Sequence, residues 1–217
     1  HNVTVAFAAL LVMLLSYFFG CFNGSFMVSH FIIRDDVRKH GSGNAGLTNF
    51  YRTYGAKYAL LVIACDMGKT VAACLLGSFF FRCLGWDGTL GTLLAGLGCE
   101  LGHIFPVFYG FRGGKGILCG VSAVFIVDYN AGVIALVVFV LAFLLTRYVS
   151  LGSVLGTISV PVTLLAKGFS GLCLILACLS VLLVIMKHGE NIVRIIRHKE
   201  PRFVFRRDLS HKLDEDN

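Results

Sequence analysis

Charged residues are scarce in this chain. Asp, Glu, Lys and Arg make up 14% of its 217 residues, whereas hydrophobic residues make up 57%. The mean hydropathy is +0.81. Because a typical soluble domain carries roughly a quarter charged residues, this composition excludes an ordinary soluble domain and indicates a protein of the lipid bilayer.

Features that would divide the chain or hold a metal are also missing. The sequence has no internal repeat, no low-complexity tract and no long linker. Its eight cysteines form no C-x-x-C pair, and no spacing of His and Cys suits zinc. We therefore predict one transmembrane domain, residues 1–200, followed by a polar cytoplasmic tail, residues 201–217, and we expect the cysteines to act as small hydrophobic residues.

Long apolar runs recur along the whole chain. About 20 apolar residues in a helix cross roughly 30 Å of hydrocarbon. We predict an all-α integral membrane protein with about seven transmembrane helices, joined on one side by glycine-rich polar loops. The fourth run has only eleven residues, so six crossings are the alternative. The runs are Val3 to Ile33, Tyr58 to Phe81, Leu90 to Phe108, Ile117 to Val127, Ala131 to Thr146, Leu151 to Ala166 and Leu172 to Met186.

The placement of Lys and Arg gives the expected orientation. If the seven runs alternate, sixteen basic residues fall on one side, whereas Arg82 and Lys167 fall on the other and Lys69 lies within a run. Basic residues accumulate in short cytoplasmic loops. We therefore predict that the N-terminus lies outside the cell and that the C-terminus and the polar motifs lie on the cytoplasmic side. The net charge of +7 then fits anionic lipid headgroups, and nucleic acid is not expected as a partner.

The most informative segment is polar and rich in glycine, and it separates the first two apolar runs. Glycine permits close backbone approach, while hydroxyl, amide and guanidinium groups suit a phosphate ester. The segment therefore predicts a membrane protein that handles a phosphorylated small molecule. Its groups of this kind belong to Ser42, Asn44, Thr48, Asn49 and Arg52.

A second cluster surrounds Lys115, where residues 111–116 read Phe-Arg-Gly-Gly-Lys-Gly after a Gly-His pair that ends in His103. Glycines beside a lysine can surround an anion with backbone amides and an ammonium group. The segment is not a P-loop, because Tyr109 stands where the first glycine is needed and Gly116 where Ser or Thr is needed. A glycine-rich helix connection with a cytoplasmic lysine is the alternative interpretation.

Three further clusters have a structural and a functional interpretation. Asp66 and Lys69 lie three residues apart within an apolar run, where charged groups are costly, so we expect them to pair, either as a structural ion pair or as support for the polar loop. Ser150 and Ser153 begin an apolar run and are either helix caps or phosphate ligands. At the end of the last run, basic residues such as Arg194 can lie at the membrane interface. That explains His188 and Asn191 less well.

These clusters, in this order, make the chain resemble the PlsY family of bacterial membrane acyl-phosphate:glycerol-3-phosphate acyltransferases over nearly its full length. No single motif is specific, but five in the same order are. The matching residues are Gly24-Ser25, residues 38–44 with Thr48-Asn49 and Arg52, Asp66 with Lys69, Gly102-His103 with Phe105-Pro106, residues 113–116, Ser150-Leu151 with Ser153, and His188 with residues 190–192 and Arg194.

The resemblance implies a seven-helix enzyme of phospholipid biosynthesis in the bacterial plasma membrane. Such an enzyme moves a fatty acyl group from acyl phosphate to the 1-hydroxyl of glycerol 3-phosphate, giving lysophosphatidic acid and phosphate. It needs no metal and no cofactor, and we expect a monomer surrounded by membrane lipids.

The resemblance also implies the residues of the site. The expected catalytic residues are Ser42, Lys115, Ser153, His188 and Asn191. These five are also expected to bind the substrates and their phosphates, together with Asn44, Thr48, Arg52, His103, Gly113, Gly114 and Arg194. The proton acceptor is left open between His188 and a phosphate oxygen of the donor.

The chain departs from the family pattern in several places, one of them its last motif. The family ends its last motif in Gly-Thr-Glu, whereas this chain reads Arg197-His198-Lys199-Glu200, which leaves the role of Glu200 in doubt.

A transporter of a phosphorylated solute would also use glycine-broken helices and basic residues. The missing repeat and the gathering of polar motifs toward one face favour the enzyme.

Overall fold

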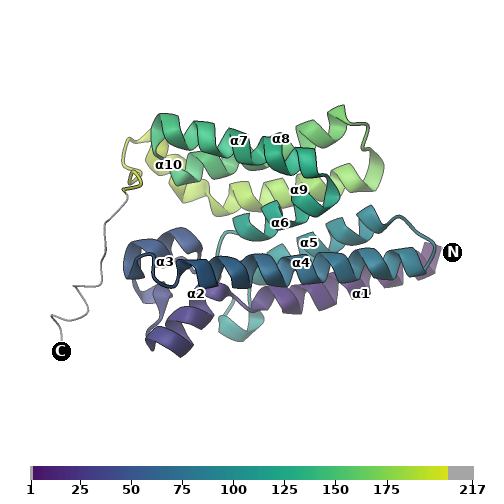
Figure 1. Ribbon diagram of the computed structural model, residues 1–217, viewed down its shortest axis with the longest axis horizontal. Coiled ribbons are helices and arrows are strands. Elements are labelled where there is room, and N and C mark those ends of the chain that lie inside the picture. The colour runs from purple at the N-terminus through teal and green to yellow at the C-terminus, as the bar shows by residue number, and fades with distance from the viewer. Residues whose placement is uncertain (1, 205–217) are drawn as a thin grey trace.

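The computed structural model describes residues 2–204, and these residues form helices and connecting loops without a strand. Figure 1 shows two layers of long helices. One layer contains α1 (Asn2–Cys21), α4 (Ala59–Cys83) and α5 (Gly88–Ile104), and the other contains α7 (Tyr129–Thr146), α8 (Val149–Ala166) and α9 (Gly171–Lys187). The helix α6 (Ile117–Val127) lies between the two layers.

Short elements gather at the end of the bundle opposite the N-terminus. They comprise α2 (Gly24–Met27), the π-helix η1 (Val28–Ile33), the 3-10 helices η2 (Val37–Lys39) and η3 (Val107–Tyr109), α3 (Leu47–Tyr54) and α10 (Gly189–Ile196). The loops that carry the polar motifs also lie at this end. The polar segments are therefore collected at one end of an apolar bundle, as the sequence predicts.

The prediction of an all-α integral membrane protein is confirmed, but the number of spans is less definite than seven. Among the described residues, five helical segments are long and apolar enough to cross a membrane, and the bent pair α9 and α10 makes a sixth. The remaining apolar run forms α6, which has 11 residues. At 1.5 Å per residue, α6 is about 16 Å long, against about 27 Å for α7. It is therefore too short to cross roughly 30 Å of hydrocarbon on its own.

Small residues allow the helices of the first layer to approach closely. A Cβ on Gly20 of α1 would lie 2.0 Å from the carbonyl oxygen of Cys99, and a Cβ on Gly102 of α5 would lie 2.0 Å from that of Tyr17. Such contacts tolerate no side chain. Interfaces of this kind are typical of membrane helices, where packing and not hydrophobic expulsion drives association.

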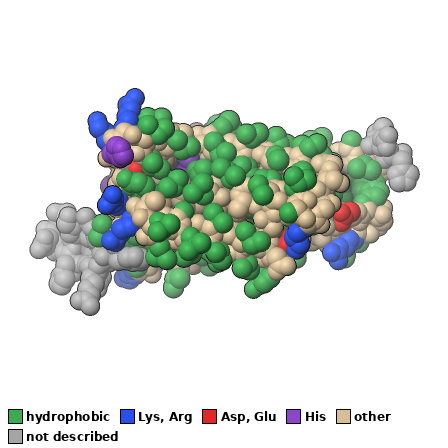
Figure 2. All heavy atoms as spheres, turned by 90° about the horizontal axis from the view of Figure 1, so that it is seen from above, with side chains coloured by type: hydrophobic (Ala, Val, Ile, Leu, Met, Phe, Trp, Pro, Cys, Tyr) green, Lys and Arg blue, Asp and Glu red, His purple; other side chains and the backbone are tan. Residues whose placement is uncertain are grey.

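The outer surface matches a bilayer environment. Many large hydrophobic side chains are exposed on the long helices, including Phe7, Leu60 and Leu145. Figure 2 shows hydrophobic side chains over the flank of the bundle, with the charged groups toward its two ends. At the end opposite the polar loops, Lys167 pairs with Asp128 and so joins the α8–α9 connection to the start of α7.

The predicted boundary of the tail at residue 201 falls only partly within the described residues. The backbone N–H of Phe203 donates to the carbonyl oxygen of Arg147 at 2.8 Å, and its ring stacks on Tyr51. Residues 201–204 therefore lie against the polar end of the bundle. Residues 205–217 lie outside the described part of the chain.

Candidate active site

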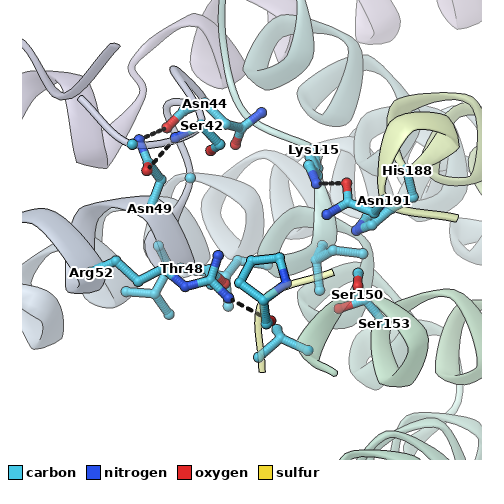
Figure 3. Close-up of a pocket in the computed structure, with 18 of the residues that line it drawn as sticks. Ser42, Asn44, Thr48, Asn49, Arg52, Lys115, Ser150, Ser153, His188 and Asn191 are labelled. Atoms are coloured by element: carbon cyan, nitrogen blue, oxygen red, sulfur yellow. Dashed lines mark hydrogen bonds between the residues drawn. The ribbon is translucent and has the colours of Figure 1, made fainter. Parts of the chain in front are cut away.

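A polar cavity of about 720 Å³ lies at the end of the bundle where the loops gather. Its wall comes from parts of the chain that are far apart in the sequence, among them the loop before α3 and α3 itself, the Lys115 loop, the start of α8 and the α9–α10 junction. Figure 3 shows their side chains around a common opening. The predicted site residues that line the cavity are Ser42, Asn44, Thr48, Arg52, His103, Lys115, Ser153, His188, Asn191 and Arg194.

The loop before α3 is organised around one buried amide, that of Asn49. Its Nδ2 lies within 3.2 Å of the carbonyl oxygens of Val37, His40 and Asn44. Its Oδ1 accepts a hydrogen bond from the backbone N–H of Ser42 at 3.1 Å. These contacts fix the loop, and the side chains of Ser42 and Asn44 line the cavity. Asn49 belongs to the polar segment that the sequence marks as suited to a phosphate ester, but it is not among the expected site residues; the structure places it in the cavity wall.

The helix α3 contributes a cation and a hydroxyl to the same wall. Arg52 and Thr48 lie one turn apart on this helix, and both line the cavity. The guanidinium group of Arg52 donates to the carbonyl oxygen of Pro201 at 3.4 Å, so it lies across the opening from the α3 side toward the last described residues.

The Lys115 loop is fixed by backbone contacts that only glycine permits. A Cβ on Gly113 would lie 1.9 Å from the carbonyl oxygen of His103, and a Cβ on Gly114 would lie 2.2 Å from Nε2 of the same histidine. The carbonyl oxygen of Gly113 also accepts a hydrogen bond from Ala45. The structure does not place Gly113 and Gly114 in the cavity wall. They hold the loop against α5, so that the side chain of Lys115 lies in the cavity.

A buried ionic cluster supports this loop from behind. The Nζ of Lys69 donates to Oδ1 of Asp66 at 2.9 Å and to the carbonyl oxygens of Gly20 and Phe22. It also lies 3.0 Å from Nδ1 of His103. Since an ammonium group only donates, Nδ1 of His103 accepts and its Nε2 carries the hydrogen beside the glycine loop. The predicted pairing of Asp66 and Lys69 is confirmed.

The opposite wall is held together by Glu200, whose role the sequence left in doubt. Its Oε1 accepts from the hydroxyl of Ser150 and from Nδ2 of Asn191, both at 2.7 Å, and its Oε2 accepts from Nε of Arg194 at 2.8 Å. Burial alone would raise the pKa of Glu200, but the hydrogen bonds from Asn191, Arg194 and Ser150 outweigh it and hold the pKa below its usual value. The feature of the sequence that could have indicated this role is that Glu200 is a single acid within a basic stretch.

Asn191 connects Glu200 to Lys115. Its amide donates to Glu200, and its Oδ1 accepts a hydrogen bond from Nζ of Lys115. Burial lowers the pKa of Lys115 to about 8, an effect that Glu200 opposes and that Arg194 and Arg52 increase. Lys115 is therefore a cation at neutral pH that loses its charge in mildly alkaline solution.

His188 lies at the junction of α9 and α10, which are bent by 57° relative to each other. The side chain is buried, and its Nδ1 lies 2.8 Å from the carbonyl oxygen of Val184. Since a carbonyl oxygen only accepts, Nδ1 carries the hydrogen, and in the neutral ring Nε2 keeps its lone pair. His188 can therefore accept a proton or a hydrogen bond at Nε2.

The charges and the shape of the site suit a molecule with an anionic head and an apolar tail. Three cations line the polar cavity, Arg52, Lys115 and Arg194, against the carboxylate of Glu200 and the buried Asp66 that Lys69 neutralises. An apolar cavity of about 310 Å³ adjoins it between α5, α6, α7, α8 and α9. The two cavities share the wall residues Leu47, Ile117, Leu118, Phe139 and Ser153. Within residues 2–204, no group of three or more His, Cys, Asp or Glu side chains could hold a metal ion.

Comparison with known proteins agrees with this geometry. Residues 10–198 match the family model for glycerol-3-phosphate acyltransferase. A protein of that name from Finegoldia magna is 39% identical over 190 residues, which cover 86% of this chain and 91% of the relative. One from Thermoanaerobacter pseudethanolicus is 36% identical over 194 residues, which cover 89% of this chain and 95% of the relative.

Two solved structures are similar over nearly their whole length. The glycerol 3-phosphate form of PlsY, an integral membrane glycerol 3-phosphate acyltransferase, has a TM-score of 0.81 at 35% identity and covers 90% of this chain and 96% of its own. The lysophosphatidic acid form has a TM-score of 0.79 at 34% identity and covers 91% and 96%. The chain therefore belongs to the PlsY family of integral membrane glycerol-3-phosphate acyltransferases.

Proposed function

We propose that this protein transfers a fatty acyl group from acyl phosphate to the 1-hydroxyl of glycerol 3-phosphate, forming lysophosphatidic acid and inorganic phosphate. The observation that carries the proposal is the junction of a cationic polar cavity with an apolar one beside Ser153. An acyl phosphate needs both environments at once, because its charged phosphate group and its hydrocarbon chain are both attached to the reacting carbonyl carbon.

The cations of the polar cavity are assigned to phosphate binding. Lys115 and Arg52 neutralise phosphate charge, and Arg194 adds to the positive electrostatic potential of the cavity from the opposite wall. The donors on Ser42, Asn44 and Thr48 bind phosphate oxygens, which suits loops rich in hydroxyl and amide groups. A site that carries three cations attracts two phosphorylated substrates and reduces the repulsion between them.

The reaction needs no covalent enzyme intermediate, because an acyl phosphate is already an activated acyl donor. The 1-hydroxyl oxygen of glycerol 3-phosphate attacks the carbonyl carbon, the bond from that carbon to the phosphate oxygen breaks, and phosphate leaves with the electron pair. The hydroxyl proton goes to a phosphate oxygen of the donor or to Nε2 of His188. Ser153 and Asn191 orient the attacking hydroxyl, so that proximity and electrostatic stabilisation supply most of the rate.

The sidedness of the charges supports a location in the bacterial plasma membrane with the cavity on the cytoplasmic side. Apart from Lys69, which is buried against Asp66, the described basic residues gather at the cavity end, whereas Lys167 and Arg82 belong to the other end. Under this proposal, glycerol 3-phosphate enters from the cytoplasm and the acyl chain comes from the bilayer.

Acyl transfer by the purified protein tests the proposal. Labelled glycerol 3-phosphate is offered with palmitoyl phosphate, palmitoyl-CoA or palmitoyl-carrier protein in parallel. We expect lysophosphatidic acid from acyl phosphate alone. Product from the other donors only would refute the donor assignment, and no product from any donor would refute the function and favour solute transport.

A pair of lysine variants tests the site in the same assay. Lys115→Ala removes the buried ammonium group of the cavity, whereas Lys39→Ala makes the same change at an exposed position outside the cavity wall. We expect the first variant to lose activity and the second to keep it.

A further inference from the structure

The apolar cavity contains one acid that the proposed reaction does not use, Glu100 of α5. The side chain is 1% exposed and lies in a wall made mostly of aliphatic residues. Its Oε2 accepts a hydrogen bond from the hydroxyl of Ser180 on α9. Its Oε1 has no hydrogen-bond partner among the described residues. An unpaired polar atom in such a place is costly, so it calls for a partner that the protein alone does not supply.

The other polar side chains of this cavity are already engaged or lie at its mouth. Thr157 donates to the carbonyl oxygen of Ser153 on its own helix, and Ser180 donates to Glu100. Ser153 belongs to the wall that this cavity shares with the polar one. Glu100 therefore offers the one unsatisfied oxygen in the deeper wall among the described residues.

Two contacts give the depth of this carboxyl group. A Cβ on Gly116 would lie 2.7 Å from Cγ and 3.1 Å from Oε1 of Glu100, so the group lies beside the residue that follows Lys115. On the other side, Ser180 precedes His188 by eight residues of sequence, or about 12 Å along a helix. The carboxyl group thus lies below the polar cavity, at a level where the first half of a long acyl chain would pass.

We propose that Glu100 makes this cavity selective for acyl chains that carry a hydroxyl group in their first half. The inference rests on the proposed function, because it assumes that the apolar cavity holds the acyl chain. A hydroxyl group both donates and accepts, so it satisfies Oε1 of Glu100 in either protonation state of the acid. An unsubstituted chain would leave that oxygen unpaired against methylene groups. A site built with a polar partner discriminates against the ligand that lacks the matching group.

The test compares hydroxylated and plain donors in the acyl-transfer assay. Palmitoyl phosphate and its 3-, 7-, 12- and 15-hydroxy derivatives are each offered with glycerol 3-phosphate, and kcat/KM is measured for each. We expect the 3- or 7-hydroxy donor to exceed palmitoyl phosphate by about tenfold, which is the range one hydrogen bond supports. The 12- and 15-hydroxy donors should show no such gain, because their hydroxyl groups pass beyond Glu100.

Three variants test whether the preference for a hydroxylated donor comes from the carboxyl group of Glu100. Glu100→Leu should abolish the preference, and Ser180→Ala, which leaves the acid in place, should retain part of it. Leu97→Ala alters the same wall without touching a polar group and should keep the full preference.

The outcomes separate this inference from the proposed function. No turnover of any donor by the unmodified protein would refute the function and the inference together. An active enzyme whose ratio of hydroxylated to plain donor is the same in Glu100→Leu would refute the inference alone. A preference confined to the 12- or 15-hydroxy donor would also overturn it, since the depth would then be wrong.

Discussion

Two glutamates flank Arg194, and they offer a matched test of how the cavity wall is held together. Glu200 accepts three hydrogen bonds and is 7% exposed. Glu190 meets the same arginine at 3.7 Å, but its side chain is 93% exposed. We predict that Glu200→Gln strongly impairs the enzyme, whereas Glu190→Gln does not. The two changes are chemically identical, so the difference isolates the environment.

The magnitude follows from the three contacts of Glu200. Gln turns an N–H toward Nε of Arg194, where two donors then face each other, so this bond of about 2 kcal/mol is lost. The bonds from Ser150 and Asn191 remain but lose a charged acceptor, which costs about half a kcal/mol each. The total is about 3 kcal/mol, or about 100-fold in kcat/KM if it falls on the alignment of Asn191 and Lys115. For Glu190, an exposed pair at that distance predicts less than about a threefold change.

The assay is kcat/KM for glycerol 3-phosphate across a range of pH, with the melting temperature of each variant as a control for folding. Glu200 opposes the lowering of the Lys115 pKa. Its neutralisation should therefore move the alkaline limb of the profile to lower pH, which a purely structural defect would not do. Equal effects of the two variants, or Glu200→Gln within threefold of the unmodified protein, would refute the role assigned to Glu200.

Three more predictions follow from the same geometry. Because the pKa of Lys115 is about 8 and only its protonated form is a cation, kcat/KM should fall as pH rises through about 8, and Lys115→Arg should lose this alkaline limb even if its activity is lower. Gly114→Ala would place a methyl group 2.2 Å from a buried imidazole and should cost about 100-fold in activity by moving the lysine loop, whereas Gly68→Ala, at an exposed position outside both cavities, meets nothing within 4 Å and should be neutral. Asp66→Asn leaves the buried Lys69 without its anionic partner and should destabilise the fold by about 3–5 kcal/mol; a melting temperature equal to that of the unmodified protein would contradict this.

The sequence predicted best those features whose absence would cost the folded protein much free energy. A charged residue within a bilayer must find a partner, so the spacing of Asp66 and Lys69 was enough to predict their pairing. Long apolar runs likewise have few alternatives to helices, since backbone groups in lipid must be satisfied within the segment. The helical architecture was predictable for that reason.

Other features depend on contacts that no local pattern encodes. Glu200 reaches Ser150, which is fifty positions earlier in the chain, and the basic residues around it resemble an ordinary interfacial segment. Asn49 is one polar residue among many until the loop wraps around its amide. Glu100 lies within a run that is hydrophobic on average, so its place in a cavity wall emerges only from the packing of α5 against α6 and α9.

The late position of Glu200 has a consequence for truncated chains. The anion that engages Ser150, Asn191 and Arg194 follows α10, the last helix of the described residues. A released chain that ends just before residue 200 therefore contains all the described helices, but the basic groups of its cavity wall lack their nearest counter-charge. Such a chain would be an inserted but inactive product, so the integrity of the site depends on residues that contribute nothing to the crossing of the bilayer.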